Sequence, residues 1–505
     1  MTSTARIWVL LFLVIAFGFA LRSYKALQID NFPHDDQISY LAAAGQLDDY
    51  VRFMPQHGEL RMAPASTWQA FTQAPASEST LDAARTISQS LLEQDIHPPL
   101  YFIWLRGVVS LLPDITLITG WISNLLFFFA STLLLFLIAR RLLRNPTAAV
   151  IAIGVWCCGV APIETSLVAR HYEILTFFTL ASTAYLLWLL DTNRFGLFTL
   201  LGYGVLACLG FLANYQFLYH LGALSLVILL AEYRRPLRVL AFALVTLAAL
   251  GLALYLYPAL LKQSAEVAGW SPPATSDDVL FRIKNTLEEV LKFCVMGSLA
   301  LIYVAVRRRD LLRQPDRRLW VLLGINLLGV AGAYLAFIAP RHAMGDRYLA
   351  AVWPFLSMAL AAALLAMWQH KIGRVVAILL VMAPALAFLK KPFKHPAPPV
   401  EIQAASVVVA DFAERGVWPS IFLHLRPDQS TVTGSQSALL AQPDWLDTLA
   451  SAGGGVYCSA AGLSGNSSTG QQQVLDLLQT RFQLEPIRSK NRGIRFYRLT
   501  PKPAA

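Results

Sequence analysis

Long uncharged apolar runs constrain this chain more than any other feature of its sequence. Four examples are Leu125–Ala139, Ala241–Tyr257, Leu319–Ile338 and Tyr348–Met367. Each approaches the ~20 residues that an α-helix needs to cross about 30 Å of hydrocarbon. Only 14% of the residues are charged, whereas soluble proteins carry about a quarter. The sequence therefore excludes a soluble enzyme and a disordered chain, and it predicts an all-α polytopic membrane protein in a lipid bilayer.

The net charge of +10 is explained by where the basic residues lie. Short loops between apolar runs carry most of the clustered arginines, namely Arg140, Arg141, Arg144, Arg234, Arg235, Arg238, Arg307, Arg308, Arg309, Arg313, Arg317 and Arg318. Cytoplasmic loops of membrane proteins carry such an excess. We place these loops in the cytoplasm and expect no nucleic-acid partner.

The apolar runs and the basic loops together predict about eleven transmembrane helices. The first enters from the cytoplasm as a retained anchor, because its apolar core lacks a convincing small-x-small cleavage site. The run Leu100–Leu112 is too short to cross and holds Arg106, so we treat it as interfacial or re-entrant. The expected spans are 7–23, 116–139, 147–163, 172–190, 195–213, 216–232, 237–257, 286–306, 319–338, 347–368 and 373–389.

An odd number of spans places the C-terminus outside the cytoplasm. The chain then divides into three parts. Residues 1–390 form the transmembrane module, with 22–98 as its first extracytoplasmic loop, and 391–399 form a Pro-rich linker. Residues 400–505 predict a small soluble α/β domain on the extracytoplasmic side of a bacterial inner membrane. Its expected strands are Ser406–Val409, Ile421–Leu425, Gly455–Cys458 and Ile494–Leu499, and its helical patterns lie near 435–451 and 470–482. In the first loop, Thr80–Asp95 is an amphipathic helix that we expect to lie flat on the membrane.

Acids and bases that are unusual near a membrane fall on the outer side in this topology. They are Asp35, Asp36, His97, Arg170, Arg341 and Arg347, with Tyr348 beside the last. Each has a structural explanation as well as a functional one. The acids would cap or solvate a helix over 37–46, or serve as a general base or bind a cation. His97 and the arginines would anchor helix ends at the interface, or clamp a phosphate.

Metal and disulfide chemistry have little support in the sequence. His34 with Asp35 and Asp36 is a minimal set for a divalent cation, and we assign no metal-ligating residue. Four of the five cysteines lie in apolar segments, which leaves Cys458 alone in the tail. No disulfide framework or zinc pattern can be built from that set.

Three motifs in a fixed order carry a resemblance to a known family. They are Phe32-Pro-His-Asp-Asp-Gln-Ile-Ser-Tyr40, His97-Pro-Pro-Leu-Tyr101 and Arg347-Tyr-Leu-Ala-Ala-Val-Trp-Pro354. On this multispan background, residues 7–390 resemble the bacterial glycosyltransferases related to protein O-mannosyltransferases and to the aminoarabinose transferase of lipid A. The resemblance implies the type C glycosyltransferase fold. It also implies a sugar donor carried on a polyprenyl phosphate.

The resemblance also implies roles for individual residues. Asp35 matches the family's catalytic aspartate, and Asp36 stands where the family usually has glutamate. His97 matches a position that is His in the mannosyltransferases and Lys in the lipid A branch. Arg347 and Tyr348 match a late Arg-Tyr pair. Arg170 matches an arginine that often precedes a middle span.

The implied reaction transfers the sugar with inversion to an unidentified acceptor on the extracytoplasmic face, with Asp35 as general base. His97, Arg170 and Arg347 would neutralise the departing phosphate. An alternative is a transporter or flippase of a lipid-linked intermediate, which would need charged residues near the bilayer midplane. A third is an inert relative that serves as a scaffold for the tail domain.

Overall fold

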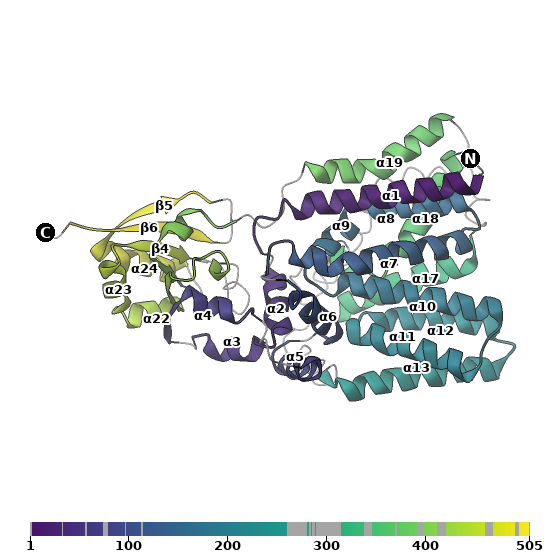
Figure 1. Ribbon diagram of the computed structural model, residues 1–505, viewed down its shortest axis with the longest axis horizontal. Helices are drawn as coiled ribbons and strands as arrows, with labels where there is room; N and C mark the ends of the chain where they lie inside the picture. The colour runs from purple at the N-terminus through teal and green to yellow at the C-terminus, as the bar shows by residue number, and fades with distance from the viewer. Residues whose placement is uncertain are drawn as a thin grey trace. The chain divides into compact units, whose positions relative to one another are not determined.

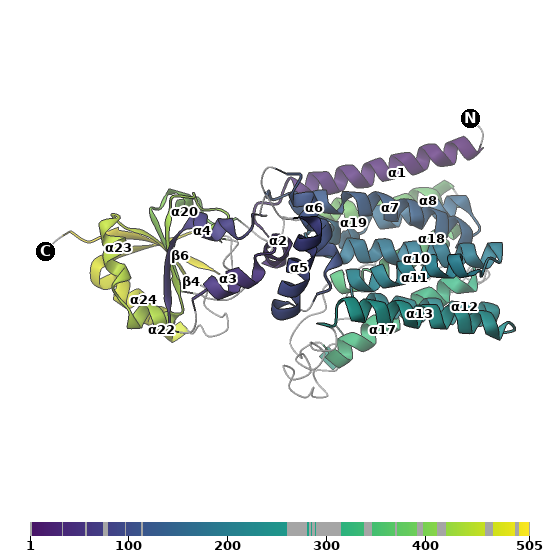
Figure 2. The same cartoon turned by 60° about the horizontal axis from the view of Figure 1, so that its bottom comes forward.

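The protein, described here by a computed structural model, consists of two compact units (Figures 1 and 2). The first, the helical unit, comprises Met1–Leu27, Asp95–Tyr101 and Gly120–Pro392. The second, the mixed unit, comprises Gln28–Gln94, Phe102–Thr119 and Phe393–Ala505. The structure describes residues 3–32, 34–55, 58–73, 79–95, 97–112, 115–259, 280–281, 284, 288, 315–337, 346–368, 371–390, 397–411, 421–459, 468–489 and 494–503.

The helical unit consists of long apolar helices that run alongside one another (Figure 1). Their bounds are α1 Ser3–Ala26, α7 Thr119–Leu142, α8 Pro146–Cys158, α9 Val160–Leu167, α10 Tyr172–Thr192, α11 Leu197–Ala213, α12 Phe217–Glu232, α13 Pro236–Leu256, α17 Arg317–Phe337, α18 Trp353–Trp368 and α19 Lys371–Leu389, with a 3₁₀ turn, η1, at Asp346–Leu349.

Among the described residues, five helices are long and apolar enough to cross a membrane, and the bent pair α8 and α9 raises the number to six. The chain is therefore a largely helical membrane protein with several spans. The expected count of eleven is not reached by this criterion. Length accounts for three of the missing spans, since α11, α12 and α18 have 17, 16 and 16 residues, below the ~20 of a full crossing. Ten of the expected spans fall on helices, and the span 286–306 lies outside the described residues apart from Glu288.

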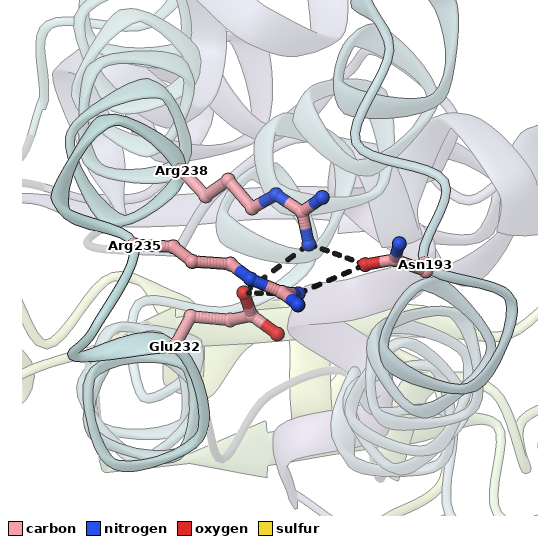
Figure 3. A network of polar contacts seen from close by, with 4 residues as sticks. All are labelled: Asn193, Glu232, Arg235 and Arg238. Carbon is pink, nitrogen blue, oxygen red and sulfur yellow. Dashed lines mark hydrogen bonds and ion pairs between the residues drawn. The ribbon is translucent and has the colours of Figure 1, made fainter.

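Basic loops gather at one end of the helical unit. Figure 3 shows Arg235 and Arg238, which precede and begin α13, reaching both Glu232 at the end of α12 and Asn193 after α10. Each guanidinium lies 3.3 Å from the Glu232 carboxylate, and both donate to the Asn193 side chain. Asn193 adopts a left-handed conformation, with φ of 54°, which ends α10. These loops carry arginines that the sequence analysis placed in the cytoplasm.

The two ends of α1 fix the direction of the chain through the helical unit. Trp8 packs against Phe136 near the C-terminal end of α7, with ring centroids 5.6 Å apart. α7 continues to Arg141, which pairs with Asp191, two residues before Asn193, so α1 begins at the basic end. At the other end, the Lys25 ammonium donates to the carbonyl of Leu389 at 3.2 Å. The chain thus leaves α19 at the end of the helical unit where α1 finishes.

The mixed unit combines the first loop with the C-terminal tail. Its elements are α2 His34–Ala43, α3 Leu47–Phe53, β1 Leu60–Pro64, α4 Ala65–Ala70, α5 Thr80–Gln94, α20 Glu401–Ala404, β2 Val407–Ala410, β3 Ser430–Gly434, α22 Gln436–Ala441, α23 Trp445–Ser451, β4 Gly455–Ser459, α24 Ser468–Arg481, β5 Phe482–Ile487 and β6 Arg495–Pro501. The short helix α6, Leu100–Val109, follows the first loop. α5 occupies the amphipathic stretch expected from the sequence.

A mixed sheet lies at the centre of this unit. Its six described strands have the order β1-β3-β2-β4-β6-β5; β2 is parallel to β3 and to β4, and the other pairs are antiparallel. The expected strands near 407, 455 and 495 are confirmed. The expected strand Ile421–Leu425 is wrong, because this segment is a turn in which the His424 amide donates to Ile421 and the Leu425 amide to Phe422. Strands β1, β3 and β5 were not predicted.

The first loop contributes to the sheet of the tail. The sequence predicts this loop as part of the transmembrane module; in the structure, Leu60 pairs with Gly434 and Pro64 with Ser430 along an antiparallel edge of the sheet. Helices α22, α23 and α24 pack on one face of the sheet (Figure 2), and the core between them includes Val409 and Trp445. On the other face, the Trp68 indole of α4 donates to the Thr431 hydroxyl at 2.9 Å.

Candidate functional site

The acidic pair lies in the first turn of α2. The helix starts at His34 and not near Gln37 as expected, so Asp35 and Asp36 are inside its first turn. Carboxylates there interact favourably with the positive end of the helix dipole. Asp36 is buried, with 3% of its surface exposed, and Asp35 is half-buried. Both residues belong to the mixed unit, so their proximity to Arg347 stays a prediction.

A second group of polar residues is centred on His97. Its Nδ1 lies 2.5 Å from a carboxylate oxygen of Asp95, and its Nε2 lies 3.2 Å from a guanidinium nitrogen of Arg170. A guanidinium can only donate, so Nε2 accepts and the ring proton sits on Nδ1, where it is donated to Asp95. His97 is therefore a neutral bridge between a carboxylate and an arginine.

Aromatic contacts extend this group to the late Arg-Tyr pair. The ring of His97 lies 4.6 Å from that of His171, and His171 lies 4.7 Å from Tyr172. Tyr172 meets Tyr348 edge-on at 6.4 Å, and the Arg347 guanidinium lies 5.4 Å from the centre of the Tyr348 ring. The structure thus brings His97, Arg170, Tyr348 and Arg347 into one run of contacts, which we call the His97 cluster. Arg341 lies outside the described residues.

The backbone that carries Arg170 is held by α7. After α9 ends, the Asn124 amide donates to the carbonyl of Val168 at 2.7 Å, while the Arg170 amide bonds back to that same carbonyl at 2.8 Å. A Cβ on Gly120 would lie 2.6 Å from the Ala169 nitrogen, which is closer than such contacts occur. Only glycine at position 120 lets α7 approach the backbone of residues 167–169 so closely. This close contact fixes the position of the Arg170 backbone.

Two tyrosines from neighbouring loops interact with residues of the cluster. The Tyr257 hydroxyl, just after α13, donates to the carbonyl of His97 at 3.2 Å. Tyr215, between α11 and α12, has its pKa raised by burial and also by the charge of Asp95. Both loops lie at the end of the bundle opposite Asn193 and Glu232, because α10 to α13 alternate in direction. The cluster and the basic loops therefore occupy opposite ends.

A buried arginine beside the cluster is not among the site residues that the sequence predicts. Arg22 in α1 is fully buried and donates to the Ser166 hydroxyl at 3.1 Å and to the Cys157 carbonyl at 2.9 Å. It also interacts electrostatically with Glu173, the neighbour of Tyr172. The available signal was a single arginine at the end of an otherwise apolar run. That pattern is equally typical of an interfacial anchor, so the sequence alone does not single out Arg22.

The described residues contain no group of three or more His, Cys, Asp or Glu side chains arranged to hold a metal ion. Within the described part of the chain, the positive groups of the His97 cluster are Arg170 and Arg347. Arg170 is buried, with 6% of its surface exposed, and Arg347 is half-buried. Guanidinium groups at the end of a helix bundle are suited to bind a phosphate headgroup.

No family model matches the chain, and no curated protein sequence matches it. Among solved structures, the chain is similar to the crystal structure of ArnT from Cupriavidus metallidurans bound to undecaprenyl phosphate. The sequences are 11% identical, the alignment covers 97% of this chain and 98% of that one, and the TM-score is 0.48.

Proposed function

We propose that this protein is a membrane glycosyltransferase that moves a sugar from a polyprenyl-phosphate carrier to an acceptor on the extracytoplasmic face. The observation that supports the proposal is the His97 cluster, in which a chain of contacts through His97, His171, Tyr172 and Tyr348 connects Arg170 with Arg347. The lipid tail of the donor lies in the bilayer beside the helices. Its phosphate reaches the two guanidinium groups at the helix ends.

The arginines act on the charge that develops during transfer. As the bond between the anomeric carbon and the phosphate oxygen breaks, the phosphate leaves with the electron pair and gains negative charge. Fixed positive groups in a partly buried site stabilise that charge more than water does. Since both ring nitrogens of His97 have partners, His97 acts by holding Arg170 in place.

Asp35 serves as the general base. The acceptor's hydroxyl or amine attacks the anomeric carbon from the face opposite the phosphate, and its proton passes to the Asp35 carboxylate. One bond forms and one breaks at that carbon, so the configuration inverts. The phosphate is a good leaving group, so no general acid is required, unlike in glycosidases.

The sidedness of the site supports an extracytoplasmic reaction. The cluster lies at the end of the helical unit opposite the loops of Arg235 and Arg238. Basic loops face the cytoplasm, which puts the cluster on the outer side. The chain leaves α19 at this same end, beside Lys25, and the tail domain follows.

The test uses purified protein in lipid nanodiscs with a polyprenyl-phosphate sugar as donor. Asp35→Asn should abolish sugar transfer while binding of the polyprenyl phosphate persists. The matched control is Asp49→Asn, because Asp49 also lies in the first turn of a short helix of the first loop, α3, and is exposed. Retained transfer by Asp35→Asn would refute the assigned base. Movement of the intact donor across the bilayer without sugar transfer would favour the transporter.

A further inference from the structure

Among the described residues of the tail domain, His424 contacts the segment that leads into α2. The His424 Nε2 lies 3.0 Å from the side-chain oxygen of Asn31. Its ring lies 5.8 Å from the ring of Phe32. Asn31 and Phe32 are both buried, with 6% of each exposed. These two residues come directly before the Pro-His-Asp-Asp stretch in the sequence.

Phe32 is in turn tied to the helix that carries the acidic pair. The Gln37 side chain, which is fully buried, donates to the carbonyl of Phe32 at 3.1 Å. The Phe32 ring also meets Tyr40 edge-on, at 6.2 Å and 88°. Asp35 and Asp36 lie between these anchor points in the sequence. A shift of Phe32 would therefore be transmitted to the first turn of α2.

The turn that presents His424 is itself held firmly. The Gln69 amide donates to the carbonyls of Phe422 and Leu425, at 2.9 and 2.8 Å. The Trp68 ring stacks on that of Phe422, with centroids 4.6 Å apart and planes 10° from parallel. Burial lowers the pKa of His424, so at neutral pH its imidazole is neutral and donates one N–H to Asn31.

We propose that His424 is a positioning residue, through which the tail domain sets the place of Asp35 and Asp36. This inference rests on the proposed function, in which Asp35 is the general base. His424 touches no reacting group; it holds Asn31 and Phe32, and they hold the first turn of α2. Precise placement of a base matters because small displacements of a reacting group lower the rate steeply.

The experiment compares His424→Ala with His424→Gln in the full-length protein. The alanine variant should lower kcat by about ten- to a hundredfold while leaving the KM for the donor unchanged, since the base moves and the phosphate site does not. Glutamine keeps an N–H donor at similar reach, so it should restore most of kcat. The matched control is Gln442→Ala, which removes another hydrogen bond from the tail to the first loop, at the Gly58 carbonyl, and should be silent.

A second measurement does not depend on activity. Amide hydrogen exchange of the peptide spanning residues 31–40 should become faster in His424→Ala and stay at the wild-type rate in Gln442→Ala. An unchanged kcat together with unchanged exchange in His424→Ala would overturn the proposal. So would a parallel loss of kcat and melting temperature in all three variants. If the wild-type protein transfers no sugar, the proposed function fails, and the exchange experiment still decides whether His424 holds α2.

Discussion

Arg170 donates a hydrogen bond to Nε2 of His97, a residue 73 positions earlier in the chain. Because Nε2 accepts this bond, Nδ1 of His97 carries the ring proton and donates it to Asp95. In the proposed function, His97 therefore supports the arginine beside it. The first prediction follows from this relationship.

Replacing His97 by glutamine should preserve much of the activity, whereas lysine should not. Glutamine has an oxygen to accept from Arg170 and an N–H to donate to Asp95. Lysine has only donors and adds a positive charge next to Arg170. We expect His97→Lys to raise the donor KM by about tenfold, equivalent to one lost hydrogen bond to a charged group. Steady-state kinetics check this, and equal effects of the two substitutions would contradict it.

Cysteine labelling can test the sidedness of the helical unit. Leu27, just after α1, is 76% exposed, and Arg194, in the loop after α10, is exposed at the basic end. In intact cells, a membrane-impermeant maleimide should react with Leu27→Cys and not with Arg194→Cys. Permeabilised cells serve as the control and should allow both to react. Labelling of Arg194→Cys from outside would reverse the orientation.

Arg22 should be important for stability. It is fully buried and joins α1 to Ser166 and to Cys157 by hydrogen bonds, and its loss would leave the buried Cys157 carbonyl without this donor. Arg22→Met should therefore lower the free energy of unfolding by about 1–3 kcal/mol. Thermal unfolding in detergent measures the effect. The exposed Arg194→Ala is the control, and equal melting temperatures for the two variants would contradict the assigned role.

Trp68 should hold the sheet of the tail domain together although it belongs to the first loop. Removing its ring takes away the stack on Phe422 and the bond to Thr431, which should cost about 3–5 kcal/mol. Met62→Ala is the control, because Met62 in β1 is 58% exposed.

The reactivity of the Cys458 thiol in β4 measures the loss of stability expected in Trp68→Ala. Burial raises the pKa of its thiol, and the nearby charge of Asp411 adds to the effect. Since only the thiolate reacts, the native protein should resist maleimide at pH 8. Trp68→Ala should accelerate modification of the Cys458 peptide, measured by mass spectrometry, and Met62→Ala should not. Equal rates in both variants would show that Trp68 does not support the sheet.

The sequence predicts the long helices well, because hydrocarbon requires a continuous apolar run. The expected spans 7–23 and 172–190 lie within α1 and α10. The bend of 56° between α8 and α9 was not predicted. It falls at Gly159, whose extended backbone separates the two helices, and hydropathy alone does not register a break between two apolar segments.

The tail was harder to predict because its strands depend on distant partners. Ile421–Leu425 is rich in apolar residues and was expected to be a strand, but its Phe422 packs against Trp68 as part of a turn. β3, Ser430–Gly434, was missed because it holds a single large apolar residue, Val432. The sequence of β1 alone does not predict a strand, because β1 is extended only where it pairs with β3.

The candidate site was predictable in its residue types and less so in its contacts. The motifs contain His97 and Arg347, the family resemblance adds Arg170, and the structure connects all three in one cluster. His171 and Tyr172 link His97 to Tyr348, and Asp95 binds His97; nothing in their local sequence signals these contacts, because they arise only from packing. Whether Asp35 lies near Arg347 stays a prediction.

The pairing of β1 with β3 has a consequence for how the protein is made. Ala63 emerges from the ribosome 368 residues before Thr431, which bonds to its carbonyl. At about 5–20 residues per second, that interval lasts roughly 20–70 s. The edge strand β1 must therefore stay unpaired until all the helices between it and β3 have been synthesised. Completion of the sheet then joins an early segment of the chain to a late one.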